Sequence, residues 1–557
     1  MLPKFFQIGF NKCGTTFIAK LFDLNGIPAV HWAEGALADD IAWSKMTGRA
    51  PLQRWAGETV AFTDMESVRF LNMPVIEAFK EYAFLDASFP GAVFLLNTRN
   101  VDDWVASRYL HWGGRYARSY AASLGVGLAD LGDIWRQEWQ DHIAGCRAHF
   151  AGRDRFIEID IDEATPDDYR TALAPWYDLS VAPKLPGAGV RKARKDYPAR
   201  LQQMLDAPAP RVHAPRRDRL AARLAGFAQP ARLSGRVDCP SDHAVLLDMD
   251  AGRLSDAKGR QLPVMRGPGG RFFQDAGHFG LLRSTSTAND IAQVARGGRY
   301  WLDMRPACLT GSVQPSGGPV IAGLRRKGAE DVFLWPAPWL HRIGNDGFPG
   351  APLGDDPPFQ DRADLAVWRG RLSGYAQDPH GDDLRHWVDG ATGNSPDAGA
   401  IRRSARWRFL ERNAGLPGTD LALHPDDRTA GVLARVGLSA PMRGDAPQGR
   451  YAISMGGGDG DADFLPLANS HAVVLKEEDG WESFVTGLFK PWRHYIPLAS
   501  GGADLAERLA WARANPDECK RISGRARRIC EGLADPAGRQ AHLAQVLAAY
   551  RAATGQG

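Results

Sequence analysis

The stretch FFQIGFNKCGTTFIAKLFDLNG at residues 5–26 joins an apolar run to a glycine-containing loop and then to an amphipathic segment. The apolar run predicts a strand that ends at Gly9. Apolar side chains at helical spacing between Phe17 and Phe22 predict a helix that opens at Thr15. A helix start offers free backbone N–H groups and the positive end of the helix dipole, which bind phosphate or sulfate. This stretch therefore predicts an anion-binding loop at the end of a strand.

The sequence on the C-terminal side of this loop repeats the same order. The runs AVFLLNT (92–98) and FIEIDI (156–161) alternate with amphipathic stretches of helical length. Such alternation predicts a parallel sheet covered by helices. We therefore expect residues 1–200 to form one α/β domain with a P-loop-like sheet.

The position of the lysine distinguishes this loop from that of the nucleoside triphosphatases. Gly9 and Gly14 have the triphosphatase spacing, but Thr15 stands where the lysine should be and the lysine lies inside the loop, at Lys12. The arrangement resembles the sulfotransferases that use 3'-phosphoadenosine-5'-phosphosulfate (PAPS), whose loop carries Lys, Gly, Thr, Thr in this order. A sulfuryl group carries less charge than a terminal phosphate, so one lysine with hydroxyl and amide donors can serve without magnesium. The resemblance implies that PAPS is bound by Lys12, Cys13, Gly14, Thr15 and Thr16, with Lys12 also acting in catalysis.

A second motif, AVFLLNTRNVDDWVASR (92–108), supports the same resemblance. Arg99 closes an apolar strand and Ser107 follows eight residues later, in a helix that Asn100 is expected to cap with Asp103 at the third position. In the PAPS-dependent family an arginine and a serine at this spacing bind the 3'-phosphate. The resemblance gives that role to Arg99 and Ser107, a forked cation and a hydroxyl.

The general base that would deprotonate the acceptor hydroxyl has several candidates. His31 is preferred, because a neutral imidazole can accept a proton at pH 7 whereas an ordinary exposed carboxylate is too weak a base. Glu34, Asp64 and Glu66 lie nearby in the sequence and stay open as alternatives.

The second part of the chain has its own organisation. Residues 201–235 interleave proline and arginine without a strand, which predicts a linker that includes a helix. Strand-like runs then appear in 236–365, followed by a second α/β block in 366–557.

Three segments of this part resemble glycosyltransferase family 90, the capsule-associated and KDEL-motif enzymes that include protein O-glucosyltransferases. They are AVWRGRLSGY (366–375), residues 450–476, and residues 480–529, whose LFKPWRHYIP run is the most specific. The resemblance implies two facing Rossmann-like domains of the GT-B type, a UDP-sugar in the cleft and no required metal. It also implies that the two blocks, 236–365 and 366–557, are an acceptor half and a donor half of one enzyme.

A diphosphate leaving group needs fixed donors when no metal neutralises it. The first candidates are Arg369 and Arg371 in a turn after a strand, and Gly456, Gly457 and Gly458, which allow close backbone approach. Two positions differ from the family's sequence pattern: Asp463 stands where the family has a phosphate-facing arginine, and Ala472 stands where it has a serine. Either another basic residue, Lys476 or Lys490, replaces that arginine, or this half has lost or changed its donor.

The inverting mechanism of the family also requires a carboxylate base. Asp303 is our candidate, and Asp275 and His278 are the alternatives. Two acidic groups resemble metal sites, the pair Asp248 and Asp250 and the cluster Asp459, Asp461 and Asp463, but this spacing arises by chance in long chains. We interpret both as loop acids and predict no metal site.

Composition limits the class of protein. The 557 residues carry a net charge of +3, which gives no basic field that would imply nucleic-acid binding. No apolar run is long enough to span a membrane, no signal peptide is recognisable, and six scattered cysteines are typical of a reducing compartment, so we expect a cytoplasmic protein with at most peripheral membrane contact.

The predicted function is that of a bifunctional enzyme, a PAPS-dependent sulfotransferase fused to a UDP-sugar-dependent glycosyltransferase. It would act on a glycan or glycolipid, such as a bacterial surface polysaccharide. In the alternative, only one half is catalytic and the other, the glycosyltransferase-like half, is a glycan-binding module.

Overall fold

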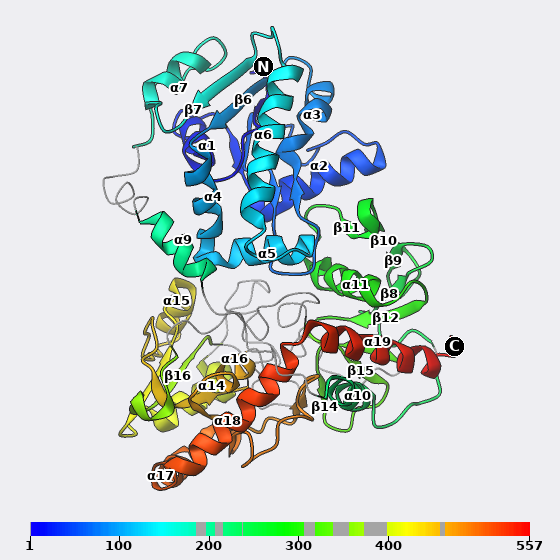
Figure 1. The fold of residues 1–557 in the computed structure, drawn as a ribbon, viewed down its shortest axis with the longest axis vertical. Coiled ribbons are helices and arrows are strands. Elements are labelled where there is room, and N and C mark those ends of the chain that lie inside the picture. The colour runs from blue at the N-terminus through cyan, green and yellow to red at the C-terminus, as the bar shows by residue number, and fades with distance from the viewer. Residues whose placement is uncertain are drawn as a thin grey trace. The chain divides into compact units, whose positions relative to one another are not determined.

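The computed structural model describes residues 2–184, 196–206, 216–236, 238–305, 318–337, 356–372, 398–456 and 463–556 (Figure 1). The chain forms two compact units. Unit 1 comprises Met1–Pro208 and Gln261–Ala292, and unit 2 comprises Ala209–Arg260 and Gln293–Gly557.

Unit 1 contains a five-stranded sheet in which all neighbouring strands are parallel, as the alternation of runs predicted. Its order is β2-β3-β1-β6-β7, formed by β1 (Phe5–Gln7), β2 (Ala29–His31), β3 (Ala61–Thr63), β6 (Val93–Thr98) and β7 (Phe156–Asp160). The quoted runs supply β1, β6 and β7. The sequence analysis did not predict β2 and β3, because each has only three residues and shows no alternation. A short antiparallel pair is added by β4 (Glu66–Ser67) and β5 (Ile76–Glu77).

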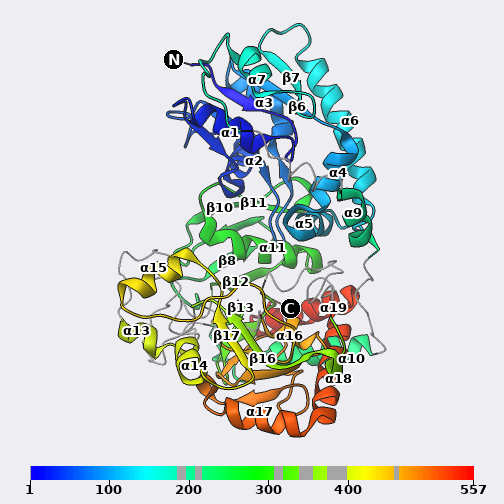
Figure 2. The same cartoon turned by 90° about the vertical axis from the view of Figure 1, so that its left-hand side faces the viewer.

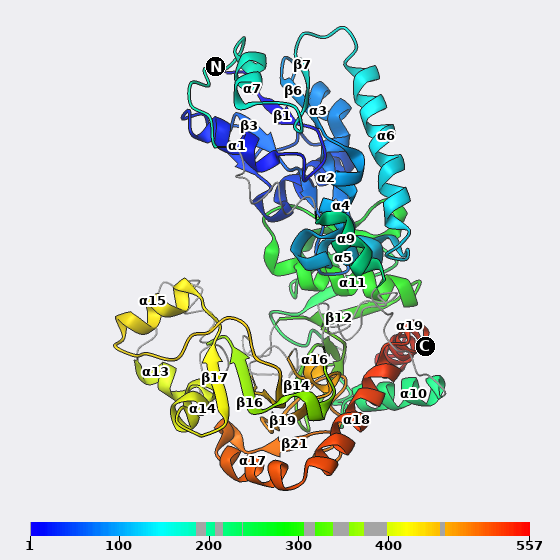
Figure 3. The same ribbon diagram turned by 60° about the vertical axis from the view of Figure 1, so that its left-hand side comes forward.

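Successive residues of the central strands point to opposite faces of this sheet, and each face is buried by helices. Phe5 belongs to one buried cluster with residues of α1 (Thr15–Asp23) and α7 (Pro166–Leu173). Phe6 belongs to another, with residues of α2 (Ala36–Thr47), α3 (Tyr82–Ser88), α4 (Val101–Tyr109), α5 (Arg115–Leu124) and α6 (Leu131–His149). Figure 3 shows α1 and α6 on opposite sides of the strands. The period of two along each strand therefore yields a sheet covered on both faces.

A segment far along the chain completes unit 1. It contains β10 (Gln261–Arg266), β11 (Phe272–Gln274) and the beginning of α11 (Leu282–Val294). The side chain of Asn72 donates to Asp290 Oδ1 at 2.6 Å and accepts from Arg271 at 2.7 Å, and Arg49 forms two hydrogen bonds to Asp275 at 2.6 and 3.0 Å. The sequence analysis placed this segment in the acceptor half at 236–365, because its long-range polar partners leave no local pattern.

Unit 2 contains a second parallel sheet, the arrangement predicted for 366–557. Its order is β17-β16-β18-β19-β21, formed by β16 (Ala363–Gly370), β17 (Thr419–Leu423), β18 (Gly449–Ser454), β19 (Val473–Glu477) and β21 (Ile496–Leu498). Figure 2 shows β16 and β17 side by side. The helices of this region are α13 (Ala398–Arg403), α14 (Ala405–Asn413), α15 (Asp427–Arg435), α16 (Phe464–Ala468), α17 (Leu505–Ala514) and α18 (Pro516–Leu533). The strand order reverses between β16 and β18, and ligands of such sheets bind beyond the carboxyl ends of the strands at this point.

The remaining strands of unit 2 are mixed in direction, whereas a second Rossmann-like domain was expected here. They are β8 (Val245–Asp248), β9 (Arg253–Ser255), β12 (Arg299–Asp303), β13 (Val320–Ala322) and β15 (Val332–Leu334). Among the described strands of this part, β12, β13 and β15 pair in parallel, whereas β8 is antiparallel to both β9 and β12. A two-residue pair of strands, β14 (Arg325–Arg326) and β20 (Trp481–Glu482), lies elsewhere in the unit.

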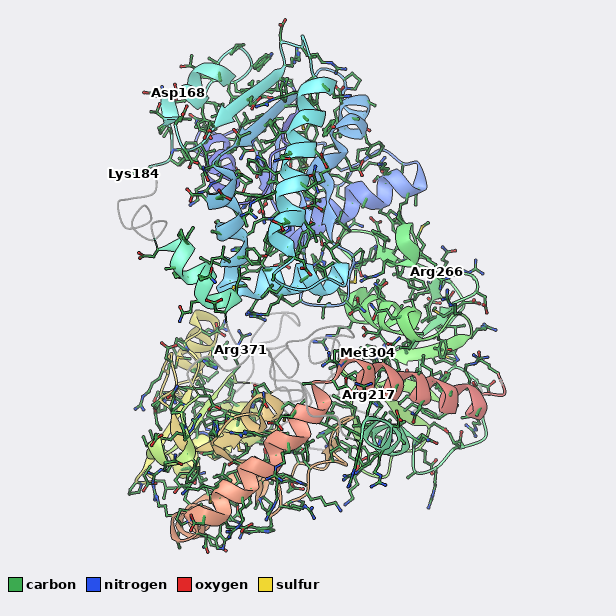
Figure 4. All side chains as sticks on the ribbon, in the orientation of Figure 1. Asp168, Lys184, Arg217, Arg266, Met304 and Arg371 are labelled. Atoms are coloured by element: carbon green, nitrogen blue, oxygen red, sulfur yellow. The ribbon has the colours of Figure 1, made fainter. Side chains whose placement is uncertain are left out.

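The helix expected within the linker at 201–235 is packed against unit 2. It is α10 (Arg217–Ala228), which lies on α19 (Pro536–Ala553), and Arg217, labelled in Figure 4, pairs with Asp535 at the start of α19. Ala221, Leu224 and Ala225 of α10 are buried. A preceding helix, α9 (Tyr197–Leu205), belongs to unit 1.

Candidate functional site

A cavity of about 430 Å³ in unit 1 lies at the carboxyl ends of its parallel strands. The lining residues come from the segments that follow β1, β3 and β6, from the end of β2, and from the turn after α4. They include Asn11, Lys12, Gly14, Thr15, Thr16, His31, Trp32, Asp64, Glu66, Arg99, Ser107, His111, Trp112, Tyr116 and Tyr197. The structure thus brings together two motifs that lie about 85 residues apart in the sequence.

The backbone of the loop is shaped to leave the start of α1 open. Lys12 and Gly14 have positive φ angles of 63° and 84°, and α1 begins at Thr15, as predicted. The first N–H groups of a helix have no partner within it, so they are available to an anion. Gly9 is required because a Cβ atom there would lie 2.5 Å from the backbone oxygen of Asn97. Cys13 is fully buried, and it contributes backbone rather than its thiol: its carbonyl accepts from the Asn97 side chain.

Two cations face the cavity. Arg99 donates to the carbonyl of Lys12 at 3.0 Å through one terminal nitrogen, while its Nε and other terminal nitrogen are buried without a hydrogen-bond partner. A carboxylate oxygen of Asp103 lies 3.9 Å from the latter. Lys12 Nζ is 3.3 Å from Nδ1 of His111, and burial lowers the pKa of Lys12. Buried unpaired guanidinium nitrogens are costly, so this geometry is suited to an anionic ligand that would pair with them.

Ser107 and the helix that carries it are positioned by the predicted cap. The Asn100 side chain accepts from the backbone N–H groups of Asp102 and Asp103 at 3.0 and 3.1 Å, which starts α4 directly after Arg99. Ser107 is buried two turns later and lines the same cavity. The capping prediction is confirmed.

The four candidates for the general base occupy different positions. His31 Nε2 is 3.2 Å from Thr16 Oγ1 and 3.7 Å from Asp64, and its Nδ1 is 3.0 Å from Thr63 Oγ1. Asp64 also lines the cavity, and burial raises its pKa. Glu34 is exposed and is not among the lining residues. His31, Asp64 and Glu66 therefore line the cavity, whereas Glu34 does not.

Glu66 is engaged in a buried network behind the cavity. Its carboxylate accepts from Asn11 and Arg108, each at 2.9 Å, and from Tyr116 at 2.8 Å, and burial raises its pKa to about 8. Arg108 is fully buried, pairs with Glu77 at 2.6 Å, and donates to the Asn11 side chain at 2.9 Å. Because Asn11 directly precedes Lys12, this network holds the loop in place.

Several cavity residues were not found from the sequence. His111 and Trp112 directly follow the helix that carries Ser107, and Trp32 directly follows His31. Burial, Lys12 and Arg108 lower the pKa of His111 to about 4, so it is a neutral neighbour of Lys12 at pH 7. The only sequence signal was their adjacency to residues already chosen.

In unit 2 the predicted donor Arg369 is already neutralised. It lies near the end of β16, its side chain is 6% exposed, and it donates to a carboxylate oxygen of Asp420 at 2.7 Å and to the Asp420 carbonyl at 2.9 Å. Arg371, labelled in Figure 4, is exposed one residue after the strand. Of the two predicted arginines, Arg371 is thus the one at the surface.

An arginine that the sequence analysis missed joins the strand ends. Arg406 of α14 is nearly buried and donates to the carbonyls of Arg371 and Gly456, each at 3.0 Å. Its guanidinium also lies 3.7 Å from the carboxylate of Asp463. Asp463, which stands where the family has an arginine, is therefore paired with a cation from another element.

The glycine loop after β18 begins beside a buried carboxylate. Glu477, at the end of β19, accepts from the backbone N–H groups of Gly456 at 2.9 Å and Gly501 at 2.7 Å. A Cβ atom at Gly456 would lie 2.6 Å from a carboxylate oxygen of Asp479, so a larger residue there would require that side chain to move. Gly457 and Gly458, with Asp459 and Asp461, lie outside the described residues.

The other predicted residues of unit 2 have structural contacts. Lys476 lies 5.5 Å from the ring centroid of Phe464, Lys490 is exposed in the loop before β21, and Ala472 is buried. Both carboxylate oxygens of Asp303 accept from Arg305, at 2.9 and 2.7 Å.

The alternatives to Asp303 and the acidic pair lie in different places. Asp275 and His278 belong to unit 1, where Asp275 pairs with Arg49. Asp248 is the last residue of β8, where it was expected in a loop, and Asp250 lies in the turn between β8 and β9. Within the described ranges, no group of three or more His, Cys, Asp or Glu side chains could hold a metal ion.

Comparison with known proteins identifies one segment of unit 2. Residues 446–534, which run from before β18 to the end of α18, match the model of Glycosyl transferase family 90. Over 87 residues the chain is 31% identical to mouse protein O-glucosyltransferase 3 and 30% identical to the human protein, which is 16% of this chain and 17% of either relative. An uncharacterized protein 027R of Frog virus 3 is 30% identical over 184 residues, 30% of this chain and 18% of the viral protein. Unit 2 therefore contains a glycosyltransferase family 90 segment, and the chain spans less than a fifth of the length of these relatives.

No helix among the described residues has the length and apolar character that crossing a bilayer requires.

Proposed function

We propose that the chain is a bifunctional transferase in which unit 1 transfers a sulfuryl group from PAPS and unit 2 transfers a sugar from a UDP-sugar. The observation that carries the first half is the convergence of Lys12, the open start of α1, Arg99 and Ser107 on one cavity. The buried guanidinium nitrogens of Arg99 that lack partners are suited to an anion with several acceptor oxygens. The glycosyltransferase part of the proposal rests on the family match at residues 446–534.

The residues of unit 1 divide the chemistry of sulfuryl transfer among them. Arg99 and Ser107 bind the 3'-phosphate, and the N–H groups at Gly14, Thr15 and Thr16 bind the 5'-phosphosulfate. His31 Nε2, which lies beside Thr16, accepts the proton of the acceptor hydroxyl while the hydroxyl oxygen forms a bond to sulfur. The bond between sulfur and the bridging oxygen breaks, and Lys12 neutralises the charge that develops on adenosine 3',5'-bisphosphate.

In unit 2 the diphosphate would bind beyond the ends of β16 and β18. Arg371 and the glycines after Gly456 are the proposed donors, with Lys490 as a further cation and no metal, while Gly456, whose N–H is bound by Glu477, allows close backbone approach. Arg406 supports this site because it ties the carbonyls of Arg371 and Gly456 to one guanidinium. Arg369, which is paired with Asp420, is proposed to position the strand end. Asp303 remains the proposed base of this half.

The acceptor is proposed to be a glycan or glycolipid, such as a bacterial surface polysaccharide, and the enzyme is proposed to work in the cytoplasm. There the thiols of its free cysteines, such as Cys13 and Cys146, would stay reduced. The pairing of Asp463 with Arg406 and of Arg369 with Asp420 favours a second candidate, in which only unit 1 is catalytic and unit 2 holds a glycan.

Calorimetric titration of the full chain with adenosine 3',5'-bisphosphate and with UDP tests both halves. Lys12→Ala should weaken binding of the adenosine nucleotide by about 1.5–3 kcal/mol, the range for a hydrogen bond to a charged group, and leave UDP binding unchanged. Arg371→Ala should weaken the binding of UDP and leave the binding of adenosine 3',5'-bisphosphate unchanged, so each variant is the control for the other. Absence of UDP binding would support the second candidate, and absence of adenosine 3',5'-bisphosphate binding would refute the sulfotransferase.

A further inference from the structure

The mouth of the unit 1 cavity carries two tryptophan rings from distant parts of the chain. Trp32 follows β2 and Trp112 follows α4, and both line the cavity with His31, His111 and Lys12. The ring centroids of the two indoles are 5.9 Å apart, and the Trp112 indole stacks on His111 at 4.3 Å with an interplanar angle of 22°. Trp112 is 45% exposed. A single exposed indole needs no explanation, but a pair at the rim of a polar cavity does.

The backbone around both indoles adopts an unusual conformation. Trp32 has a φ angle of 59°, and Ala33, Glu34 and Gly35 after it are also positive, at 47°, 55° and 85°. Trp112 has a φ angle of 49° and precedes Gly113 and Gly114, at 62° and 82°. Left-handed conformations are disfavoured for residues with a side chain and are concentrated at ligand-binding sites. Two independent left-handed turns thus direct indoles to one cavity.

The turn at Trp112 is held from behind by its neighbours. The ring of Phe70 lies 5.5 Å from that of Trp112, and the guanidinium of Arg115 lies 4.4 Å from the Phe70 ring. A Cβ atom at Gly114 would lie 2.9 Å from Met204 of α9, so this helix closes on the turn. The same helix begins with Tyr197, which also lines the cavity. Phe70, Arg115 and Met204 therefore pack around this turn, while Trp112 itself stays partly exposed.

We propose that Trp32 and Trp112 form an acceptor platform that stacks on the apolar face of a sugar ring and presents one of its hydroxyl groups to His31. This inference rests on the proposed sulfotransferase activity and assigns the residues that would hold its saccharide acceptor. A pyranose combines a flat face of C–H groups with hydroxyls around its edge, so it needs an aromatic surface beside hydrogen-bonding groups. The platform supplies the first, and His31, Thr16 and Asp64 supply the second. A phenol would instead favour an enclosed apolar pocket without these polar walls.

The test measures transfer from radiolabelled PAPS by the full chain to cellotriose, maltotriose, chitotriose and 4-nitrophenol. Transfer to a saccharide is expected, with a KM that rises at least tenfold in Trp112→Ala and in Trp32→Ala. Trp112→Phe keeps an aromatic face and should stay within about threefold of the wild type. Trp176→Ala is the matched control, because Trp176 is a half-buried tryptophan of unit 1 outside the cavity. The dissociation constant of adenosine 3',5'-bisphosphate should not change in any of these variants.

Transfer to 4-nitrophenol alone, or a saccharide KM that Trp112→Ala leaves unchanged, would overturn the platform. The proposed function is judged separately, by binding of adenosine 3',5'-bisphosphate. Should that binding be absent, titration of indole fluorescence with the same three saccharides still decides the platform. A saturable change that Trp112→Phe retains and Trp112→Ala loses supports it, and no saturable change with any saccharide overturns it.

Discussion

The cavity of unit 1 and the strand ends of unit 2 are both built at the carboxyl edge of a parallel sheet, but they use their cations differently. In unit 1, Arg99 keeps two buried nitrogens without hydrogen-bond partners, one of them 3.9 Å from the half-exposed carboxylate of Asp103, and Lys12 is near a neutral imidazole. In unit 2, Arg369 is paired with Asp420, and Arg406 lies beside Asp463. A motif thus places a cation, but the partner that another element brings decides whether its charge remains available.

The largest effect is expected from the network behind the unit 1 cavity. Arg108→Met leaves the buried carboxylate of Glu66 without its cation and leaves Glu77 with Lys80 alone, so the unfolding free energy of unit 1 should fall by about 3–5 kcal/mol. Calorimetric unfolding of the full chain measures the change. Arg136→Met is the matched control, because this arginine pairs with Asp102 at the surface and should cost less than about 1 kcal/mol. A loss for Arg108→Met no larger than the control would show that the network does not stabilise unit 1.

The neutralised arginine of unit 2 gives the next prediction. Arg369→Leu removes a buried partner of Asp420, which retains Arg443, so a loss of about 1–3 kcal/mol in the unfolding free energy of unit 2 is expected. UDP affinity should stay within about twofold of the wild-type value, because the charge of Arg369 is already neutralised by Asp420. The double variant Arg369→Leu with Asp420→Leu should recover part of the stability. A tenfold or larger loss of UDP affinity in that double variant would restore Arg369 as a donor and remove the contrast between the units.

The difference between the units also explains what could be predicted from the sequence. The loop at Lys12, the cap at Asn100 and the strands β1, β6 and β7 depend on residues close in the chain, and local patterns were sufficient to predict them, whereas the short strands β2 and β3 were missed. Pairs such as Arg369 with Asp420, separated by 51 residues, or Arg49 with Asp275, separated by 226, leave no such pattern. The same holds for Trp112, whose role depends on its meeting Trp32 in the folded chain.

The two units also differ in the surroundings of their histidines. His111 lies beside Lys12 in the cavity, whereas His542 is fully buried in unit 2, stacked on Phe484, and burial lowers its pKa to about 3. The unfolded chain binds a proton at this residue near pH 6.5, so between pH 6.5 and about 3 it holds more protons than the folded chain. The unfolding free energy of unit 2 should therefore fall with falling pH, by up to about 1.4 kcal/mol per pH unit for this group.

His542→Phe removes that group and keeps a ring against Phe484. The variant should lose part of the acid dependence of the unit 2 unfolding transition, measured by urea titration between pH 7 and pH 4. The unit 1 transition of the same samples serves as the internal control, because its own buried histidine, His142, is unchanged. Equal slopes in the wild type and the variant would mean that His542 does not set the acid sensitivity.

The smallest expected effect separates stability from binding within unit 1. Asn100 caps α4 and Thr165 caps α7, in the latter case with Asp168 in a capping box (Figure 4). Removing either cap leaves helix N–H groups without their partner, so Asn100→Ala and Thr165→Ala should each lower the unfolding free energy by about 1 kcal/mol. Of these two helices, α4 carries the cavity residue Ser107 and follows Arg99, whereas no residue of α7 is among the lining residues of the cavity. Asn100→Ala should therefore also weaken the binding of adenosine 3',5'-bisphosphate several-fold, whereas Thr165→Ala should leave that affinity unchanged. Equal nucleotide affinities in the two variants, at equal losses of stability, would show that the start of α4 does not position the anion-binding groups. The contrast between the open site in unit 1 and the neutralised arginine in unit 2 would then depend on Lys12 and its loop alone.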